Sequence, residues 1–248
     1  MMLRVKDILK EIELYAPLPL QESFDNAGVQ VGDINQTATG VLLCLDVTEE
    51  VIDEAVKKGA EVVVTHHPLI FAPLTSVESD SLVYKAVKSG VTFISSHTCL
   101  DKAIGGVNDC LARKAGITNV QHDTVDEFLK IGEVEPCCAK EFAEKIKAAL
   151  GGAVAFTDNG KTIRRVAFCS GGGGDLINAA AAMGADALLT GEAKHHEFLE
   201  AKHLGVALFA AGHYETEVVA CDYLSDILSK EFDDAQVVLF KRAPVNYM

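Results

Sequence analysis

The chain has 248 residues, of which 49% are hydrophobic and 23% are charged, which is the composition of a globular protein long enough to form its own core. Its 22 basic and 36 acidic residues give a net charge of −14, which argues against nonspecific binding to nucleic acid or to an anionic membrane. No uncharged apolar run approaches the roughly 18 residues that a membrane-spanning helix needs.

Apolar runs of strand length alternate with helical patterns along the chain. In the first half, strands are predicted at 41–46, 61–65 and 91–95, and helices at 49–58, 81–88 and 104–115. In the second half, strands are predicted at 165–170, 187–190 and 206–210, and helices at 175–183, 194–202 and 215–230. Strands that are apolar on both faces and are separated by helices indicate βαβ units with buried, largely parallel sheets.

The polar segment 118–136 lies between these two halves and is the predicted lobe boundary. We therefore expect an N-terminal α/β lobe at 1–125 and a C-terminal α/β lobe at 126–248, which together make one compact unit. The predicted fold class is α/β, with two related lobes, mixed and largely parallel sheets, and a cleft between the lobes.

The two halves also resemble each other in sequence. Residues 41–67 align with residues 166–192, and Glu61 and Val63 then match Asp186 and Leu188. Identities occur at Val41/Val166, Cys44/Cys169, Ile52/Ile177, Ala55/Ala180, Gly59/Gly184, Ala60/Ala185 and Thr65/Thr190. Any two βαβ units share some of these features, but the matching polar residues after each Thr favour two related lobes that face each other.

The first polar cluster is Thr65-His66-His67-Pro68, at the carboxyl end of a predicted strand. Ligands of open α/β sheets bind at this edge. Adjacent side chains on a strand point to opposite faces, so His66 and His67 can reach two neighbouring positions, as a pair of metal ions requires. Taken alone, a His-His pair is also compatible with solvated or internally hydrogen-bonded histidines.

Two further strand ends carry a histidine followed four residues later by an acid. His97 precedes Asp101, and His213 precedes Glu217, which falls on the same face of a helix that begins near His213. The three strand ends thus present His66, His67, Asp101, His213 and Glu217 as candidate metal ligands, with His97 and Cys99 nearby. Imidazole and carboxylate donors suit zinc, iron or manganese better than calcium, and a carboxylate can bridge two cations.

Other polar segments leave alternatives open. The loop at 23–33 is either a set of turns or a source of hydrogen bonds to ligands or substrate. The glycine loop Gly171–Gly174 is either a tight turn or an anion-binding loop, although it lacks the Lys-Ser/Thr of a P-loop. His195 and His196 have no assigned role. Cys99 is interpreted as a packed thiol, and seven cysteines without a CxxC pair indicate a reduced, cytoplasmic protein.

These segments together resemble the Nif-three-like family, the GTP cyclohydrolase I type 2 homologues. The resemblance covers nearly the whole chain, including segments 25–32, 65–68, 97–101, 190–192 and 212–217. It implies two α/β lobes around a dinuclear metal centre whose ligands are His66, His67, Asp101, His213 and Glu217, and a toroidal homohexamer. The chain departs from the family pattern at Phe24, where Trp is common, and at Ala27, where Val is usual.

The function predicted from the sequence is a metal-dependent hydrolase of a small anionic or nucleotide-like substrate. Two divalent ions would activate water for hydrolysis. His97 is predicted to orient a ligand or carry a proton, with a structural role as the alternative. The rival function is a noncatalytic metal-binding scaffold or regulator with a protein or nucleic-acid partner. A third interpretation is a nucleotide-binding module that uses the glycine loop.

Overall fold

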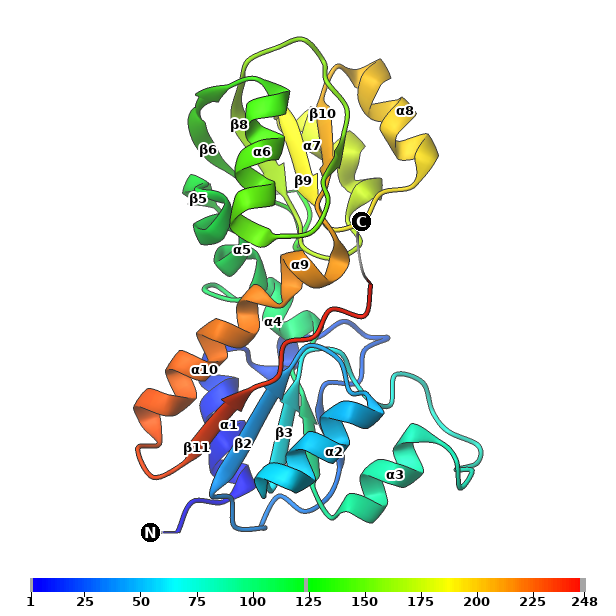
Figure 1. Cartoon of the computed structure of the whole chain (residues 1–248). Coiled ribbons are helices and arrows are strands. Elements are labelled where there is room, and N and C mark those ends of the chain that lie inside the picture. The colour runs from blue at the N-terminus through cyan, green and yellow to red at the C-terminus, as the bar shows by residue number, and fades with distance from the viewer. Residues whose placement is uncertain (1, 123–124, 246–248) are drawn as a thin grey trace. The chain divides into compact units, whose positions relative to one another are not determined.

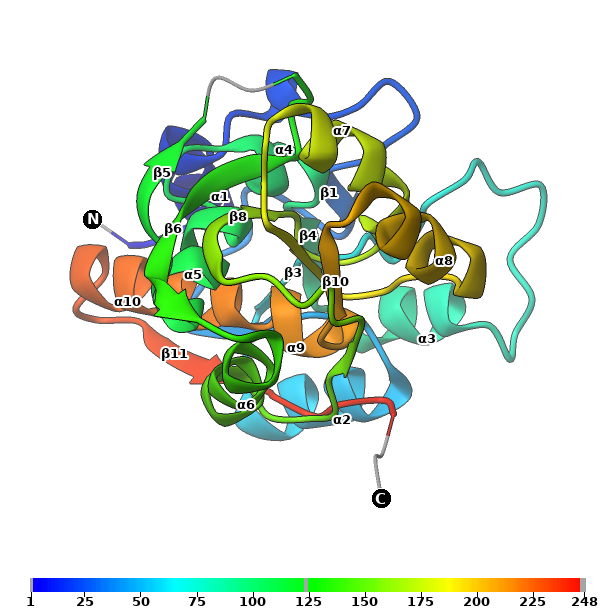
Figure 2. The same ribbon diagram turned by 90° about the horizontal axis from the view of Figure 1, so that it is seen from above.

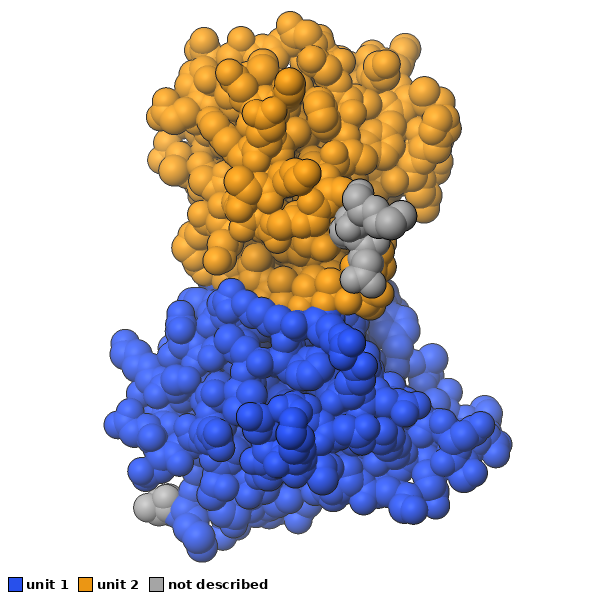
Figure 3. Space-filling model, viewed as in Figure 1, with its two compact units in different colours: residues 1–106, 220–242 blue, residues 107–219, 243–248 orange. Residues whose placement is uncertain are grey.

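The chain forms two compact units in a computed structural model that describes residues 2–122 and 125–245. Unit 1 comprises residues 1–106 and 220–242, and unit 2 comprises residues 107–219 and 243–248 (Figure 3). The sequence predicts one division between residues 125 and 126, whereas the units divide after 106 and again after 219. Each unit is described by itself.

Unit 1 is built around a five-stranded sheet with the order β1-β4-β3-β2-β11. Its strands are β1 (Gly28–Val31), β2 (Gly40–Cys44), β3 (Val62–Thr65), β4 (Thr92–Ser95) and β11 (Gln236–Leu239). Its helices are α1 (Val5–Tyr15), the short 3-10 helix η1 (Leu18–Leu20), α2 (Glu49–Lys58), α3 (Leu82–Ser89), α4 (Thr98–Lys102) and α10 (Val219–Glu231). The strands β11, β2, β3 and β4 are parallel, and β1 pairs with β4 in antiparallel orientation.

The pairing of β11 with β2 explains why residues from the end of the chain belong to unit 1. Gln236 aligns with Gly40 and Leu239 with Leu43 in a parallel ladder, which satisfies the edge of β2. Within unit 1, the Tyr15 ring of α1 packs edge-on against the Tyr223 ring of α10, and the ring centroids are 6.2 Å apart. Helices α1 and α10 lie on the opposite side of the sheet from α2 (Figures 1 and 2).

Helix α2 illustrates how local sequence sets an element and its packing. The Thr48 side chain accepts a hydrogen bond from the Val51 amide at the N-terminus, and Gly59 ends the helix in the left-handed conformation at φ 68°. The apolar stripe of α2 packs with α3 onto one face of the sheet. The buried members of this core are Leu42, Cys44, Val51, Ile52, Ala55, Ala60, Val63, Ala86, Val91 and Phe93.

Unit 2 is built around a six-stranded mixed sheet with the order β5-β6-β8-β9-β10-β7. Its strands are β5 (Thr118–Gln121), β6 (Lys130–Cys137), β7 (Ala155–Phe156), β8 (Ile163–Phe168), β9 (Ala187–Thr190) and β10 (Ala207–Ala210). Its helices are α5 (Val107–Ala115), α6 (Ala139–Leu150), the 3-10 helix η2 (Gly174–Leu176), α7 (Ile177–Ala182), α8 (His195–Leu204) and α9 (His213–Glu217). Strands β8, β9 and β10 are parallel, and the three outer pairings are antiparallel.

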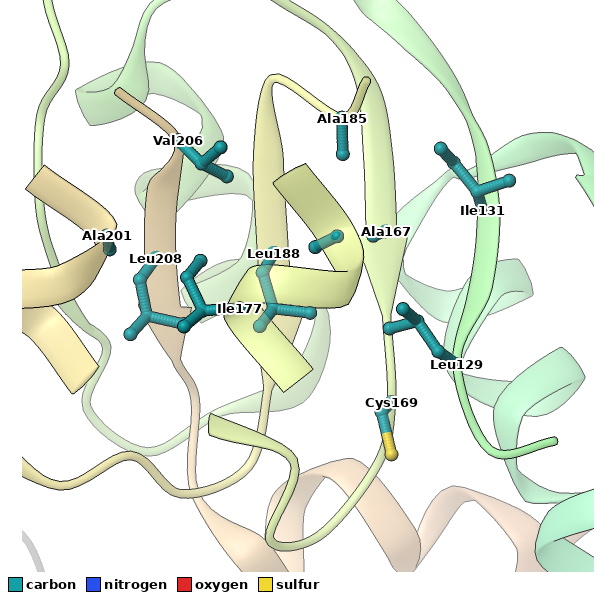
Figure 4. Close-up of a cluster of buried hydrophobic side chains, with 11 residues drawn as sticks. Leu129, Ile131, Ala167, Cys169, Ile177, Ala185, Leu188, Ala201, Val206 and Leu208 are labelled. Atoms are coloured by element: carbon teal, nitrogen blue, oxygen red, sulfur yellow. The ribbon is translucent and has the colours of Figure 1, made fainter. Parts of the chain in front are cut away.

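Both faces of the second sheet are covered. Ile177 of α7 and Ala201 of α8 pack with Leu188 and Leu208 on one face (Figure 4). Because side chains alternate along a strand, Phe209 faces the other way. There its ring meets Phe142 of α6 edge-on at 4.9 Å between centroids. The central strands are therefore buried on both faces, as their continuous apolar sequences predict.

The polar segment 118–136 differs from its prediction as a link between lobes. It contains β5 and most of β6, which pair with each other, and β6 also pairs with β8. The polar sequence reflects exposure, because Glu133 and Glu135 of β6 and Thr118 of β5 are exposed on the outer part of the sheet. Elsewhere the predicted strands and helices are present with small shifts at their ends, except that the helix predicted at 215–230 is divided into α9 and α10. Among the described residues, no helix has both the length and the apolar character that crossing a bilayer requires.

Candidate metal centre

His66 and His67 lie at the carboxyl end of β3, where several hydrogen bonds fix the backbone. The His66 amide donates to the Cys44 carbonyl at 3.3 Å and the His67 amide to the Leu45 carbonyl at 3.0 Å. The Ser95 hydroxyl donates to the His66 carbonyl at 2.9 Å. The parallel ladder therefore continues past the end of β3 and holds both histidines in defined positions.

Each imidazole of unit 1 is oriented through its Nδ1 atom. The Nδ1 atoms of His66, His67 and His97 lie 2.9 Å from the Ser96 carbonyl, 2.7 Å from Asp46 Oδ1 and 2.8 Å from Asp25 Oδ1, respectively. A backbone carbonyl oxygen and the oxygens of an ionised carboxylate can accept hydrogen bonds but cannot donate them. Each Nδ1 therefore carries the proton. In the neutral form of such a ring the lone pair is on Nε2, which is how a carboxylate or carbonyl prepares a histidine for a metal ion.

The three imidazoles converge. Ring centroids are 5.0 Å apart for His66 and His67, 5.1 Å for His66 and His97, and 5.5 Å for His67 and His97. One potential ligand nitrogen from each ring lies within 4.8 Å of the others. Asp101, at the end of α4, places Oδ1 at 3.6 Å from His66 Nε2. Unit 1 alone therefore gathers three nitrogen donors and one carboxylate.

Asp25 links the loop at 23–33 to this cluster. Its side chain is completely buried, and it also accepts hydrogen bonds from the Thr98 amide and hydroxyl. Burial acts to raise the pKa of the Asp25 carboxyl, but the hydrogen bonds from Thr98 and His97 outweigh burial and hold the pKa below its usual value. The carboxylate therefore stays ionised and fixes the His97 ring. The loop thus bonds through Asp25 to His97, the residue predicted to orient a ligand or carry a proton.

Unit 2 has a second arrangement of the same chemistry at α9. His213 Nε2 lies 3.0 Å from Glu217 Oε2, one helical turn along the same face, as the four-residue spacing predicts. His213 Nδ1 lies 3.1 Å from Glu192 Oε2. Glu217 is buried, with 5% of its surface exposed. A carboxylate thus orients the imidazole from one side, and a buried carboxylate lies beside its Nε2 atom.

Glycines allow α9 to approach the strand ends this closely. A Cβ atom on Gly191 would lie 2.5 Å from the Gly171 carbonyl oxygen and 2.6 Å from Thr216 Oγ1. A Cβ atom on Gly171 would lie 2.2 Å from Glu217 Oε1. Side chains at either position would displace α9 together with His213 and Glu217, so these glycines serve close packing.

The glycine loop is therefore a tight turn rather than an open row of donors. The Gly171 amide donates to Thr216 Oγ1 at 3.1 Å, and the Gly173 amide donates to Thr190 Oγ1 at 2.8 Å. Two of the amides that an anion would need are already hydrogen-bonded within the chain. A cavity of about 630 Å³ lies beside the loop within unit 2, and its lining includes Gly172, Glu192, Lys194 and His213.

The other histidines and the cysteines that the sequence analysis considered differ in their exposure to solvent. His195 and His196 are exposed on α8. Cys99 is fully buried, and burial raises the pKa of its thiol, as expected for a packed cysteine. All seven cysteines lie in the described part of the chain, and none is in a disulfide.

Sequence reasoning did not identify Asp46 and Ser96 as the partners of His67 and His66. Asp46 follows β2, the strand next to β3, at the same height as the His pair, and this position was a sequence signal for its contact with His67. The partner of His66 is a backbone carbonyl, which no residue type reveals.

The donor sets fit a transition-metal or zinc site. They combine imidazole nitrogens with carboxylate oxygens, whereas calcium and magnesium sites are dominated by oxygen. The orienting partners of His66, His67 and His213 supply the outer contacts that metal-binding histidines normally have. The chain therefore contains His, Asp and Glu groups that could hold a metal ion.

The chain is similar to known proteins in sequence and in structure. A GTP cyclohydrolase 1 type 2 homolog of Clostridium perfringens is 32% identical over 255 residues, covering 97% of this chain and 97% of the relative. A GTP cyclohydrolase 1 type 2 of Helicobacter pylori is 30% identical over 226 residues, covering 86% of each chain. The crystal structure of the Staphylococcus aureus hypothetical protein SA1388 is similar over 100% of both chains, with a TM-score of 0.92 and 27% identity.

A family model also matches nearly the whole sequence. Residues 3–244 match Duf34/NIF3, described as NGG1p interacting factor 3. The resemblance inferred from the strand-end histidines and acids is thereby confirmed, and the chain belongs to the DUF34/NIF3 family.

Proposed function

We propose that this protein is a metal-dependent hydrolase that holds two divalent metal ions, zinc, iron or manganese, and acts on a small anionic or nucleotide-like substrate. The observation that carries the proposal is the convergence of His66, His67 and His97 with each Nδ1 atom fixed by an oxygen acceptor. This arrangement directs ring nitrogens with lone pairs toward a common point, as a metal ion requires and as solvated histidines do not.

The proposed ligands are His66, His67 and Asp101 from unit 1 and His213 and Glu217 from unit 2. Within unit 1, Asp101 lies beside Nε2 of the buried His66. Within unit 2, Glu217 lies beside Nε2 of His213. Each unit thus has a carboxylate next to the imidazole nitrogen that would bind metal. Five side chains for two ions leave coordination positions for water and substrate, which favours catalysis over a closed structural site.

Metal ions bound there would polarise the bond that is attacked and lower the pKa of water. The chain's own residues orient the ligands and handle protons. Asp46, Asp25 and Glu192 hold the Nδ1–H groups of His67, His97 and His213. His97 is proposed to move a proton at its Nε2 atom, since Asp25 stabilises the charged imidazolium that such a step forms. If His97 instead binds metal, the same hydrogen bond orients it as a ligand.

The printed names of the relatives favour hydrolysis of a nucleotide ring. A protein named GTP cyclohydrolase 1 type 2 is 30% identical to this chain. Opening a purine ring by hydrolysis and cleaving a phosphoester both use activated water, so both belong in a substrate screen. By family resemblance, we also propose a homohexamer in the cytoplasm, where seven cysteines without disulfides are expected to persist.

The test begins with elemental analysis of gently purified protein and continues with a hydrolase screen in the presence of the metal found. We expect about two ions per chain and hydrolysis that Glu217→Gln lowers together with metal content. Fewer than one ion per chain under metal-replete conditions would contradict the proposal. Full metal content without hydrolysis of any nucleotide tested would instead favour a scaffold or regulator.

A further inference from the structure

Two phenylalanine side chains in unit 1 are exposed beside the histidine cluster. Phe24 is 61% exposed and Phe71 is 50% exposed. Their ring centroids lie 6.2 Å apart, and the Phe71 ring lies 6.1 Å from the His97 ring. Single exposed apolar residues are common. Exposed apolar side chains that lie together and are rimmed by polar residues are a feature of ligand-binding surfaces.

The backbone that carries both rings is anchored although the rings are not buried. Asp25, next to Phe24, is held by His97 and Thr98. Asn26 Nδ2 donates to the Ile70 carbonyl at 2.6 Å, one residue before Phe71. Gln30 Oε1 accepts a hydrogen bond from the Ile70 amide at 2.9 Å. These bonds tie the two segments together and hold the rings ready for a ligand, which lowers the entropy lost on binding.

We propose that Phe24 and Phe71 form an aromatic platform that stacks against the planar heteroaromatic ring of the substrate, next to His97. This assignment rests on the proposed function, and it narrows the substrate class to molecules with a flat heterocycle such as a nucleobase. Aromatic side chains bind such rings by offset or edge-on stacking, and they do so without hydrogen bonds that specify one base. The platform positions the ring, while the polar cluster acts on the bond to be broken.

The other occupant of an exposed aromatic pair is a second copy of the chain. The contact of Phe71 with His97 favours a small ligand, because a chain covering both rings would also cover an imidazole that the proposed chemistry needs. The two occupants give different dependences on protein concentration and on ligand, so one experiment separates them.

The chain has no tryptophan, so single-tryptophan variants report on chosen positions without background from other indoles. The variants are Phe24→Trp, Phe71→Trp and the control Leu199→Trp, since Leu199 is 57% exposed on α8 of unit 2. Each metal-loaded protein is titrated with guanosine 5′-monophosphate and, separately, with ribose 5-phosphate, which lacks the heterocycle. We expect quenching by the nucleotide at positions 24 and 71, none at 199, and none with ribose 5-phosphate.

A second measurement uses truncation and does not depend on an added fluorophore. Phe24→Ala and Phe71→Ala are each expected to weaken binding of guanosine 5′-monophosphate about five- to tenfold by calorimetry, the range for loss of one stacking contact. Binding of ribose 5-phosphate and the metal content are expected to stay unchanged, and Leu199→Ala is expected to match the parent protein.

Several results would overturn the platform. One is an equal loss of affinity for both probes in the alanine variants. Another is tryptophan emission that changes with protein concentration but not with nucleotide. The last is the absence of nucleotide binding by protein that retains its metal. The last result leaves the metal-dependent function standing. Conversely, protein that takes up fewer than one metal ion per chain under metal-replete conditions but still shows nucleotide quenching at positions 24 and 71 supports the platform and contradicts the proposed function.

Discussion

The central strands of the two units share one βαβ design, and comparing them shows which parts of the design are structural. In unit 1, Val41 pairs with Val62 and Cys44 with Thr65. In unit 2, Val166 pairs with Ala187 and Phe168 with Leu189, which is the same register 125 residues later. The alignment of 41–67 with 166–192 is therefore confirmed residue by residue in the strand pairing.

In each unit, an acidic residue accepts hydrogen bonds from backbone amides at the amino end of a central strand. Glu61 Oε2 accepts hydrogen bonds from the Thr39 and Gly40 amides at 2.8 and 2.9 Å. Asp186 Oδ2 accepts hydrogen bonds from the Arg164 and Arg165 amides, both at 2.9 Å. The two carboxylates occupy equivalent positions and bond equivalent amides, so the similarity of Glu61 and Asp186 reflects a shared structural role.

The units differ at the other end of the same strands. His66 and His67 in unit 1 correspond to Gly191 and Glu192 in unit 2. Unit 1 presents imidazoles directly from the strand, whereas Gly191 makes room for α9 and Glu192 orients the histidine that α9 supplies. The amino ends of the strands are alike because they maintain the sheet, whereas the carboxyl ends present different polar side chains.

The largest expected effect tests whether the two cores contribute alike. Leu188→Ala leaves a cavity in the fully buried core of unit 2 and is expected to lower the free energy of unfolding by about 2–5 kcal/mol. The equivalent substitution in unit 1, Val63→Ala, removes one methylene fewer and is expected to cost about 1 kcal/mol less. Urea unfolding measures both. Equal stability of Leu188→Ala and the parent protein would contradict the buried core.

The next effect concerns the divergent strand ends. His66→Ala is expected to weaken metal binding by more than the roughly 10–100-fold that loss of an outer hydrogen-bond partner costs. Metal affinity is measured by competition with a chelator, and metal content by elemental analysis. His203→Ala is the control, because His203 is exposed on α8. Equal metal affinities for the two variants would remove His66 from the ligand set.

A glycine substitution sharpens the comparison at the position equivalent to His66. Gly191→Ala places a Cβ atom within 2.6 Å of two oxygen atoms and is expected to destabilise the protein by about 1–3 kcal/mol. Gly172→Ala is the matched control, since the nearest atom to its Cβ would lie 4.0 Å away. Thermal unfolding compares them. A Gly191→Ala variant as stable as Gly172→Ala would show that α9 does not need this close approach.

The smallest expected effect concerns Glu61, the acidic residue at the amino ends of the strands, where the two units are alike. Burial acts to raise the pKa of Glu61, but hydrogen bonds from Thr39 and Gly40 prevail and lower it. A lowered folded-state pKa stabilises the protein above the unfolded value of about 4.3, and this contribution is lost as pH falls through the folded value.

Glu61→Gln is therefore expected to cost about 1 kcal/mol at pH 7 and less below about pH 4. Asp186→Asn serves as the counterpart in unit 2. Urea unfolding at both pH values measures the difference, and a penalty for Glu61→Gln that does not decrease at low pH would contradict this role of the carboxylate.

Much of the fold could be predicted from the sequence because its central elements depend on local patterns. Apolar runs fixed the positions of β3, β9 and β10, and helix α2 has the predicted ends because Thr48 and Gly59 cap it. Strands β5 and β6 were not predicted, since their polar residues on an exposed face resemble a loop until the pairing partner is known.

The sequence by itself determined the family, the alternation of strands and helices, and the residue types offered at the strand ends. The tertiary structure decided which of these polar groups act together. It paired Asp25 with His97, residues 72 positions apart, and joined β11 to β2 across nearly the whole chain. Such contacts depend on packing between distant segments, and local propensity carries no information about them, whereas strand and helix periodicity is written within a few consecutive residues.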